Sequence, residues 1–305
     1  MVRANGLAIH VEQMEPPAAA PSAPPKAHAA LSSAWLAGSG APAEPPTVVM
    51  IHGMANDSLA SWYFTLASPL AEAGLRVVMY DQRGHGHSER PATGYRLDDF
   101  VDDLEALLAE LGITGPVHLL GNSFGGTVAF GFAIRHPERV LSIGAIESEP
   151  ATEEWARRVA RKLNKAAAYL PREDTLAKIG ANRGKRAVRR ARAAAEMIAA
   201  TSVARDLPVS RLPATEQITA LGCPVLCIYG ECSDMVELAP AVERLLPNVR
   251  TVILPGQRHS LLIDEPATVR RLVLSWLRQE CGFEPRTPAA LVDDELVGLR
   301  LPPTA

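Results

Sequence analysis

Short apolar runs alternate with amphipathic segments along most of the chain. The apolar runs span residues 47–51, 75–80, 117–120, 140–146, 225–229 and 249–254. Mostly apolar runs of this length are typical of strands that are buried on both faces. Because segments with helical periodicity separate them, the pattern predicts a parallel sheet with helices on both faces. Ligands would then bind at the carboxyl ends of the strands.

The pattern changes over residues 147–212, where helices follow one another without an intervening strand. Apolar side chains recur there at helical spacing in two stripes, at residues 155–170 and 188–198. This predicts a helical cap, residues 147–212, inserted between two parts of a core at residues 1–146 and 213–280.

The two ends of the chain differ from this core. Residues 7–12 alternate in polarity and predict a strand that could pair with residues 30–36 as a hairpin. Segments rich in Pro and Ala, at residues 15–29 and 38–46, predict surface loops. Residues 281–305 have too few apolar side chains to fold alone and are expected to form a tail.

The charge is nearly balanced overall but is divided unevenly. The 305 residues carry a formal net charge of −3, which gives no general attraction to nucleic acid. From Trp155 to Leu212 there are 15 Lys or Arg against 4 Asp or Glu, a net +11 that leaves −14 on the rest. The sequence therefore predicts a basic cap on an acidic core.

No segment predicts export or membrane insertion. A short strand, not an apolar stretch, follows the basic N-terminus, and no apolar run approaches the length of a membrane span. The four cysteines show neither a C-x-x-C pair nor zinc-ligand spacing. We therefore expect reduced thiols, no metal site, no membrane contact and a cytoplasmic location.

The candidate chemistry centres on the segment Gly121-Asn122-Ser123-Phe124-Gly125-Gly126. Gly121 and Gly125 bracket Ser123 in the G-x-S-x-G spacing of a nucleophile elbow, in which the chain leaves a strand, turns sharply and enters a helix. A serine hydroxyl needs a base to become a good nucleophile. The N–H of Phe124, at the start of the following helix, could stabilise the oxyanion.

Four motifs together resemble those of the α/β-hydrolase superfamily, over residues 47–279. They are His52-Gly53, the loop Asp81-x-Arg83-Gly84-x-Gly86-x-Ser88, the Ser123 elbow, and Asp234 followed by His259. The resemblance implies a mostly parallel eight-stranded sheet with helices on both faces and an inserted helical cap. His52 and the polar loop at residues 81–88 are then expected to brace the backbone and not to act on substrate.

The resemblance also implies roles for single residues, without any cofactor. Ser123 is the nucleophile, His259 the base that takes its proton, and Asp234 the acid that orients the imidazole. The backbone N–H groups of Met54 and Phe124 form the oxyanion hole.

The identity of the acid stays open between three carboxylates. Asp234 lies four residues after Gly230, whereas three is commoner in the family. Glu147 and Glu149, at the end of an earlier strand, could reach the same histidine. Asp234 is the first choice and either glutamate is the alternative.

The residues around Ser123 also narrow the reaction. We expect Trp62, Asn122 and Trp155 to contact substrate. A serine at the elbow, where dehalogenases and epoxide hydrolases of this fold have aspartate, argues against an alkyl-enzyme ester. Asn122 resembles the carbon–carbon bond hydrolases, but residues 53–57 do not match their glycine-rich oxyanion loop. We therefore expect hydrolysis of a carboxylic ester or thioester through an acyl-enzyme on Ser123. The alternatives are carbon–carbon bond hydrolysis, or ligand binding without turnover.

The basic cap suggests which esters are favoured. Its cations are expected opposite the apolar stripes, on the outer rim of the pocket: Arg157, Arg158, Arg161, Lys162 and Lys165 on the first helix, and Arg186, Arg189, Arg190 and Arg192 on the second. Such a field would attract an anionic acyl carrier, either acyl carrier protein or coenzyme A. The alternative is a solvated helical face without a partner.

Overall fold

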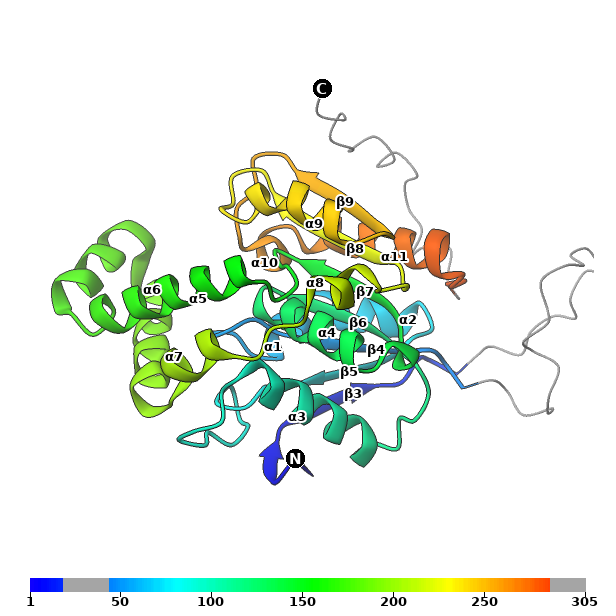
Figure 1. Cartoon of the computed structure of the whole chain (residues 1–305), viewed down its shortest axis with the longest axis horizontal. Coiled ribbons are helices and arrows are strands. Elements are labelled where there is room, and N and C mark those ends of the chain that lie inside the picture. The colour runs from blue at the N-terminus through cyan, green and yellow to red at the C-terminus, as the bar shows by residue number, and fades with distance from the viewer. Residues whose placement is uncertain (19–43, 286–305) are drawn as a thin grey trace, which may run out of the picture.

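The computed structural model describes residues 1–18 and 44–285, and a mostly parallel sheet lies at its centre (Figure 1). The strands of this sheet are β3 (Val11–Met14), β4 (Thr47–Ile51), β5 (Arg76–Tyr80), β6 (Val117–Asn122), β7 (Val140–Ile146), β8 (Val225–Gly230) and β9 (Val249–Leu254). Their order across the sheet is β3-β5-β4-β6-β7-β8-β9. β3 pairs antiparallel with β5, and the other pairs are parallel. The carboxyl ends of the parallel strands therefore share one edge.

The N-terminal segment differs from the predicted hairpin. β1 (Val2–Ala4) and β2 (Leu7–Ile9) pair with each other antiparallel, across Asn5 and Gly6, which both have positive φ. This separate ribbon leaves seven strands in the main sheet of the described residues, where eight were expected. Residues 30–36, the expected hairpin partner, lie outside the described residues, as do most of the two predicted loops and the tail from residue 286 onward.

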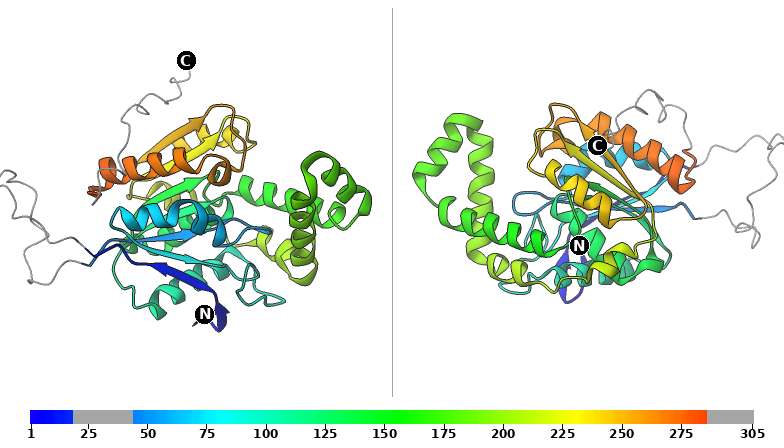
Figure 2. Two further views of the ribbon diagram at one scale, coloured as in Figure 1. Left: turned by 180° about the vertical axis from the view of Figure 1, so that it is seen from behind. Right: turned by 45° about the horizontal axis from the view of Figure 1, so that its top comes forward.

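Helices cover both faces of the sheet (Figures 1 and 2). They are α1 (Ala60–Trp62), α2 (Ser68–Glu72), α3 (Leu97–Glu110), α4 (Phe124–Arg135), α5 (Glu153–Tyr169), α6 (Glu173–Ala200), α7 (Val203–Asp206), α8 (Thr215–Thr219), α9 (Ala239–Leu245), α10 (Leu261–Asp264) and α11 (Pro266–Cys281). A π-helical turn, Tyr63–Ala67, joins α1 to α2. Two clusters of buried apolar side chains hold these layers together. Residues of α3, α4, α8 and α9 pack on one face, and residues of α1, α2, α10 and α11 pack on the other.

Helices α5, α6 and α7 form an arm beyond the carboxyl end of β7 (Figures 1 and 2). α5 begins after Thr152, whose hydroxyl accepts a hydrogen bond of 3.2 Å from the N–H of Trp155. α6 is interrupted at Gly184, which has a φ of 76° that a helix does not allow. Trp155 and Leu163 of α5 are buried in the same apolar cluster as the sheet and α4. The apolar side of α5 therefore faces the body of the protein.

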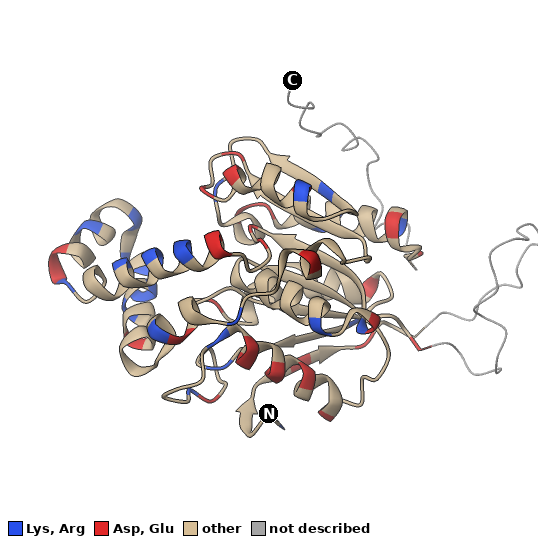
Figure 3. Ribbon diagram, in the orientation of Figure 1, with Lys and Arg blue, Asp and Glu red and all other residues tan. Residues whose placement is uncertain are grey.

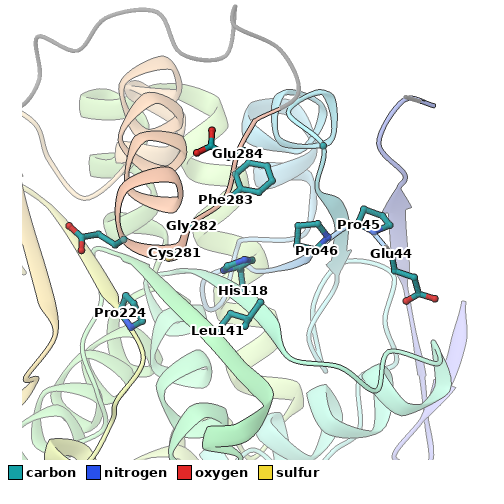
Figure 4. A pocket seen from close by; sticks show the side chains of 12 residues that line it. Glu44, Pro45, Pro46, His118, Leu141, Pro224, Cys281, Gly282, Phe283 and Glu284 are labelled. Atoms are coloured by element: carbon teal, nitrogen blue, oxygen red, sulfur yellow. The ribbon is translucent and has the colours of Figure 1, made fainter. Parts of the chain in front are cut away.

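A cavity of about 580 Å³ opens at the opposite, amino-terminal edge of the sheet (Figure 4). Its lining includes His118 at the start of β6, Leu141 on β7 and Cys281 at the end of α11. The His118 side chain is buried, and its Nδ1 lies 2.7 Å from the hydroxyl of Ser142. Burial lowers the pKa of His118 to about 4.

This buried histidine should make stability depend on pH. An unfolded histidine has a pKa of about 6.5, so at lower pH the unfolded chain binds a proton that the folded chain excludes down to about pH 4. Stability is therefore lost as pH falls, and His118 should account for a loss of about 2 kcal/mol between pH 7 and pH 5. Urea unfolding of wild type and His118→Asn at both pH values measures this difference. The same loss in both proteins would contradict the prediction.

Candidate active site

Ser123 lies at a sharp turn between β6 and α4, where the elbow motif predicts it (Figure 1). Its backbone has φ 52° and ψ −121°, a conformation that is unfavourable for a residue other than glycine. The surrounding packing must hold this conformation. Part of that packing is a close approach of backbones, because a Cβ atom at Gly125 would lie 2.1 Å from the carbonyl oxygen of Ile51. The turn presents Ser123 at the carboxyl edge of the sheet.

His259 follows β9 at the same edge, and its imidazole pairs with Glu147, which follows β7. Nδ1 of His259 lies 2.8 Å from Oε2 of Glu147. Glu147 is fully buried, whereas 47% of the His259 side chain is exposed. A histidine that donates its Nδ1–H to a carboxylate keeps Nε2 as its basic atom. Nε2 has no hydrogen-bond partner in the described part of the chain, and neither has the hydroxyl of Ser123.

Two further donors hold the carboxylate of Glu147 in place. The backbone N–H of Gly230 donates to Oε1 at 2.5 Å, and the hydroxyl of Ser233 donates to Oε2. Gly230 is the last residue of β8, and Ser233 lies in the loop that follows it. A buried charge is tolerated only when it is paired and hydrogen-bonded, and these contacts satisfy both carboxylate oxygens.

Asp234, the first choice of acid, pairs with Lys162 in the structure, whereas His259 pairs with Glu147. Oδ2 of Asp234 lies 2.7 Å from Nζ of Lys162 on α5, and 61% of the Asp234 side chain is exposed. Burial raises the pKa of Asp234, but the Lys162 ammonium, with a smaller contribution from the nearby His259, outweighs it, and the net shift is downward. The cause is the course of the loop: Ser233 turns inward to Glu147, and the next residue, Asp234, faces outward. Glu149, the other alternative, forms an ion pair with Arg158.

The two predicted oxyanion donors lie beside Ser123. Met54 and Phe124 both line the cavity at this residue. Within the described residues, neither backbone N–H has an acceptor. Asp57 fixes the loop that carries Met54, because its Oδ2 accepts hydrogen bonds from the N–H of Gly53 at 2.7 Å and from the amide of Asn122 at 3.2 Å. Free N–H groups held in this way can stabilise a developing oxyanion.

Two buried histidines brace the same loop from below. Burial lowers the pKa of His52, and it lowers the pKa of His85 to about 3, so both rings are neutral. A neutral ring can accept a hydrogen bond. Nε2 of His52 accepts from the N–H of Gln82 at 2.9 Å, and Nε2 of His85 accepts from the N–H of Ala55 at 2.8 Å. These contacts position backbone and leave no ring atom directed at Ser123.

A cavity of about 150 Å³ adjoins Ser123 beneath α5. Its apolar wall comes from Trp155, Leu163, Leu207 and Met235. It is smaller than the cavity at the amino-terminal edge, but it contains the elbow serine and the two free N–H groups. The chemistry therefore assigns the site to the smaller cavity.

The three residues that we expected to contact substrate lie in different places. Trp155 lines the cavity, and only 3% of it is exposed. Trp62 is fully buried in the apolar cluster between the sheet and α11, away from Ser123. Asn122 turns its amide to Asp57, and neither it nor Trp62 is among the residues that line the cavity.

Arg158 and Lys162, which the sequence interpretation put on the outer rim, both line the cavity. Arg158 departs clearly from that prediction, because only 13% of its side chain is exposed, whereas 54% of the Lys162 side chain is exposed. The signal was present, since a helix turns by about 100° per residue and this places both residues on the same side as Trp155.

In the described part of the chain, no helix is both long and apolar enough to cross a bilayer. Nor does any group of three His, Cys, Asp or Glu side chains there have a geometry that could hold a metal ion.

Known proteins with similar sequences and structures share this architecture. The family of the alpha/beta hydrolase fold matches residues 46–189. A 2-(acetamidomethylene)succinate hydrolase from Mesorhizobium japonicum is 29% identical, over 76% of this chain and 88% of that protein. A pimeloyl-[acyl-carrier protein] methyl ester esterase from Aeromonas hydrophila subsp. hydrophila is 28% identical, over 72% of this chain and 91% of that protein. A thermophilic esterase from Thermogutta terrifontis has a similar structure, with a TM-score of 0.63 and 22% identity over 92% of this chain and 98% of that one.

The chain therefore has the fold of the α/β-hydrolase superfamily. It is a hydrolase of this class, with the mostly parallel sheet and flanking helices of the fold.

Proposed function

We propose that this hydrolase cleaves a carboxylic ester or thioester through an acyl-enzyme on Ser123. The observation that carries the proposal is the hydrogen bond from His259 to the buried Glu147, at the strand edge where the elbow presents Ser123. This pair supplies an oriented base at the strand edge that also carries the half-buried Ser123, and activation of a hydroxyl requires such a base.

In the first half of the reaction, Ser123 Oγ attacks the carbonyl carbon of the substrate while Nε2 of His259 takes the hydroxyl proton. Glu147 keeps the Nδ1–H of the imidazole in place and stabilises the cation that forms. The N–H groups of Met54 and Phe124 donate to the oxyanion. When the intermediate collapses, the bond to the leaving oxygen or sulfur breaks, and His259 returns the proton to the departing alcohol or thiol.

In the second half, water replaces the leaving group. His259 takes a proton from water as its oxygen attacks the acyl carbonyl, and it then returns the proton to Ser123 as the acyl-enzyme bond breaks. The products are the free carboxylic acid and the original enzyme.

Ester cleavage is favoured over carbon–carbon cleavage because the amide of Asn122 is directed to Asp57 and does not line the cavity. The name of one relative, a methyl ester esterase, describes ester hydrolysis.

The test is a panel of methyl, p-nitrophenyl and thioester substrates of increasing acyl length, assayed with purified enzyme. Turnover of short esters is the expected result. No turnover of any ester or thioester, together with cleavage of a vinylogous 1,5-diketone, would overturn the proposal.

An acidic acyl carrier is the second part of the proposal. Basic side chains gather on α5 and α6 (Figure 3), and those of Arg157, Arg161, Arg172 and Arg192 are more than half exposed. Surface carboxylates pair with some of them, but the net charge of +11 between Trp155 and Leu212 remains. Such a field would attract coenzyme A or an acyl carrier protein. One relative is named for an acyl-carrier substrate.

Salt should separate a carrier-linked substrate from a neutral ester. We expect kcat/KM for an acyl-CoA to fall about tenfold between low and high ionic strength, because salt screens exposed charges, while a neutral ester changes little. Changing the exposed Arg189, Arg190 and Arg192 together to Gln should remove most of this difference. Equal salt dependence for both substrates would contradict the proposal of an anionic carrier and favour a solvated basic surface without a partner.

A further inference from the structure

One cation inside the catalytic cavity is not used by the proposed reaction. Arg158 lies on α5 and lines the same cavity as Ser123, with 13% of its side chain exposed. Lys162, one turn further along the helix, also lines this cavity. Burial lowers the pKa of Arg158, but an arginine stays charged at any pH that a protein tolerates. Burying a cation in the cavity that holds the nucleophile is costly, so we ask what this side chain binds.

These two cations offer the cavity more hydrogen-bond donors than their ion pairs use. Nη2 of Arg158 pairs with Glu149, and Nζ of Lys162 pairs with Asp234 at 2.7 Å. A guanidinium and an ammonium each have more N–H donors than one such contact uses. Both oxygens of Glu147, the other carboxylate in the lining, already accept hydrogen bonds. A ligand in this cavity therefore meets N–H donors from two cations.

The shape of the cavity limits what can reach these donors. At about 150 Å³ it is small, and Trp155, Leu163, Leu207 and Met235 make much of its wall apolar. Cavities for drug-sized ligands start at about 300 Å³, so this one fits a short acyl chain. Such a chain would lie against the apolar wall, with its reacting carbonyl at Ser123 and its far end at Arg158.

We propose that Arg158, assisted by Lys162, binds a carboxylate at the far end of the acyl group. The preferred substrates are then half-esters or half-thioesters of short dicarboxylic acids, with one acid group free. A planar guanidinium matches the two oxygens of a carboxylate, and the pair is stronger where water is excluded. Glu149 holds the guanidinium in position but leaves part of it open to the cavity. This inference rests on the proposed ester hydrolysis at Ser123.

Two methyl esters that differ only in the far acid group test the inference. They are monomethyl glutarate and methyl pentanoate, which have the same five-carbon acyl chain, and hydrolysis is followed by release of methanol. The measured quantity is the ratio of kcat/KM for the acid ester to kcat/KM for the neutral ester. Wild type should prefer the acid ester, and Arg158→Gln should lower the ratio by about 10- to 100-fold, the effect of losing a charged hydrogen bond.

A matched control and a second variant keep the result interpretable. Arg161→Gln removes the same charge from the same helix, but its side chain is 64% exposed, and it should leave the ratio unchanged. Arg158→Gln leaves the carboxylate of Glu149 buried without its partner, which could destabilise the fold. The double variant Arg158→Gln with Glu149→Gln removes both charges and should show the same fall in the ratio. Free glutarate should also inhibit wild type more strongly than it inhibits this double variant.

Three outcomes would overturn the inference, and they can be told apart. If wild type hydrolyses methyl pentanoate at least as well as monomethyl glutarate, the proposed function stands and the carboxylate site does not. If Arg158→Gln lowers the melting temperature and slows hydrolysis of both esters equally, the Arg158–Glu149 pair only stabilises the packing of α5 on the rest of the protein. If wild type hydrolyses neither these esters nor the wider ester panel, the proposed function itself fails.

Discussion

Replacing Ser123 with alanine is expected to abolish ester hydrolysis, lowering kcat by about 10⁶ as in other serine triads, while the protein stays folded. The loss follows because no other described side chain lies at the elbow to attack the carbonyl carbon. The fold should survive because the hydroxyl of Ser123 has no hydrogen-bond partner among the described residues, and its removal leaves no buried polar group unpaired.

Steady-state kinetics and a thermal unfolding curve of the same preparation measure this result. A variant that unfolds near the wild-type temperature and hydrolyses no ester is the expected outcome. Turnover close to wild type in the purified alanine variant would show that Ser123 is not the nucleophile.

The second large effect is expected at Glu147. Glu147→Gln should lower kcat by about 10⁴, because an amide in place of the carboxylate can hold His259 in the wrong tautomer and cannot stabilise its cation. Oε1 of glutamine can still accept the N–H of Gly230, which keeps one of the contacts of the carboxylate.

Asp234→Asn is the matched control, since it makes the same chemical change at the carboxylate that the sequence favoured. Asp234 pairs with Lys162 at the edge of the cavity, where 61% and 54% of the two side chains are exposed. Exposed pairs contribute little, so kcat should stay within about threefold of wild type. A larger loss in Asp234→Asn than in Glu147→Gln would restore Asp234 as the acid.

Much of the framework could be predicted from sequence because it depends on local patterns. The apolar runs of the central strands β4, β6 and β8 are buried on both faces, and in α3 the buried Phe100, Leu104, Leu107 and Leu108 recur with the helical period. The elbow was also predictable, because only small residues fit where Gly125 packs against the backbone of β4. The positions of Ser123 and His259 in the site were also predictable, because both residues come after the carboxyl ends of strands.

The carboxylate that pairs with His259 could not be predicted, because the pairing depends on the paths of the loops at this edge. Glu147, Glu149 and Asp234 all follow strands that end at the same edge, so strand order alone does not distinguish them. The structure separates them through their partners, which are His259 for Glu147, Arg158 for Glu149 and Lys162 for Asp234. Tertiary contacts decide which of these carboxylates reaches His259, and no local pattern contains those contacts.

The most direct test of the proposed mechanism is to trap the acyl-enzyme and locate it. Wild type and Ser123→Ala are mixed with a p-nitrophenyl ester, quenched in acid within one turnover, digested and analysed by mass spectrometry. The proposal predicts an added mass equal to the acyl group on the peptide that contains Ser123 in wild type, and no such mass in Ser123→Ala. An acyl group on any other residue, or hydrolysis by wild type without any covalent adduct under conditions where the acyl-enzyme should accumulate, would contradict it.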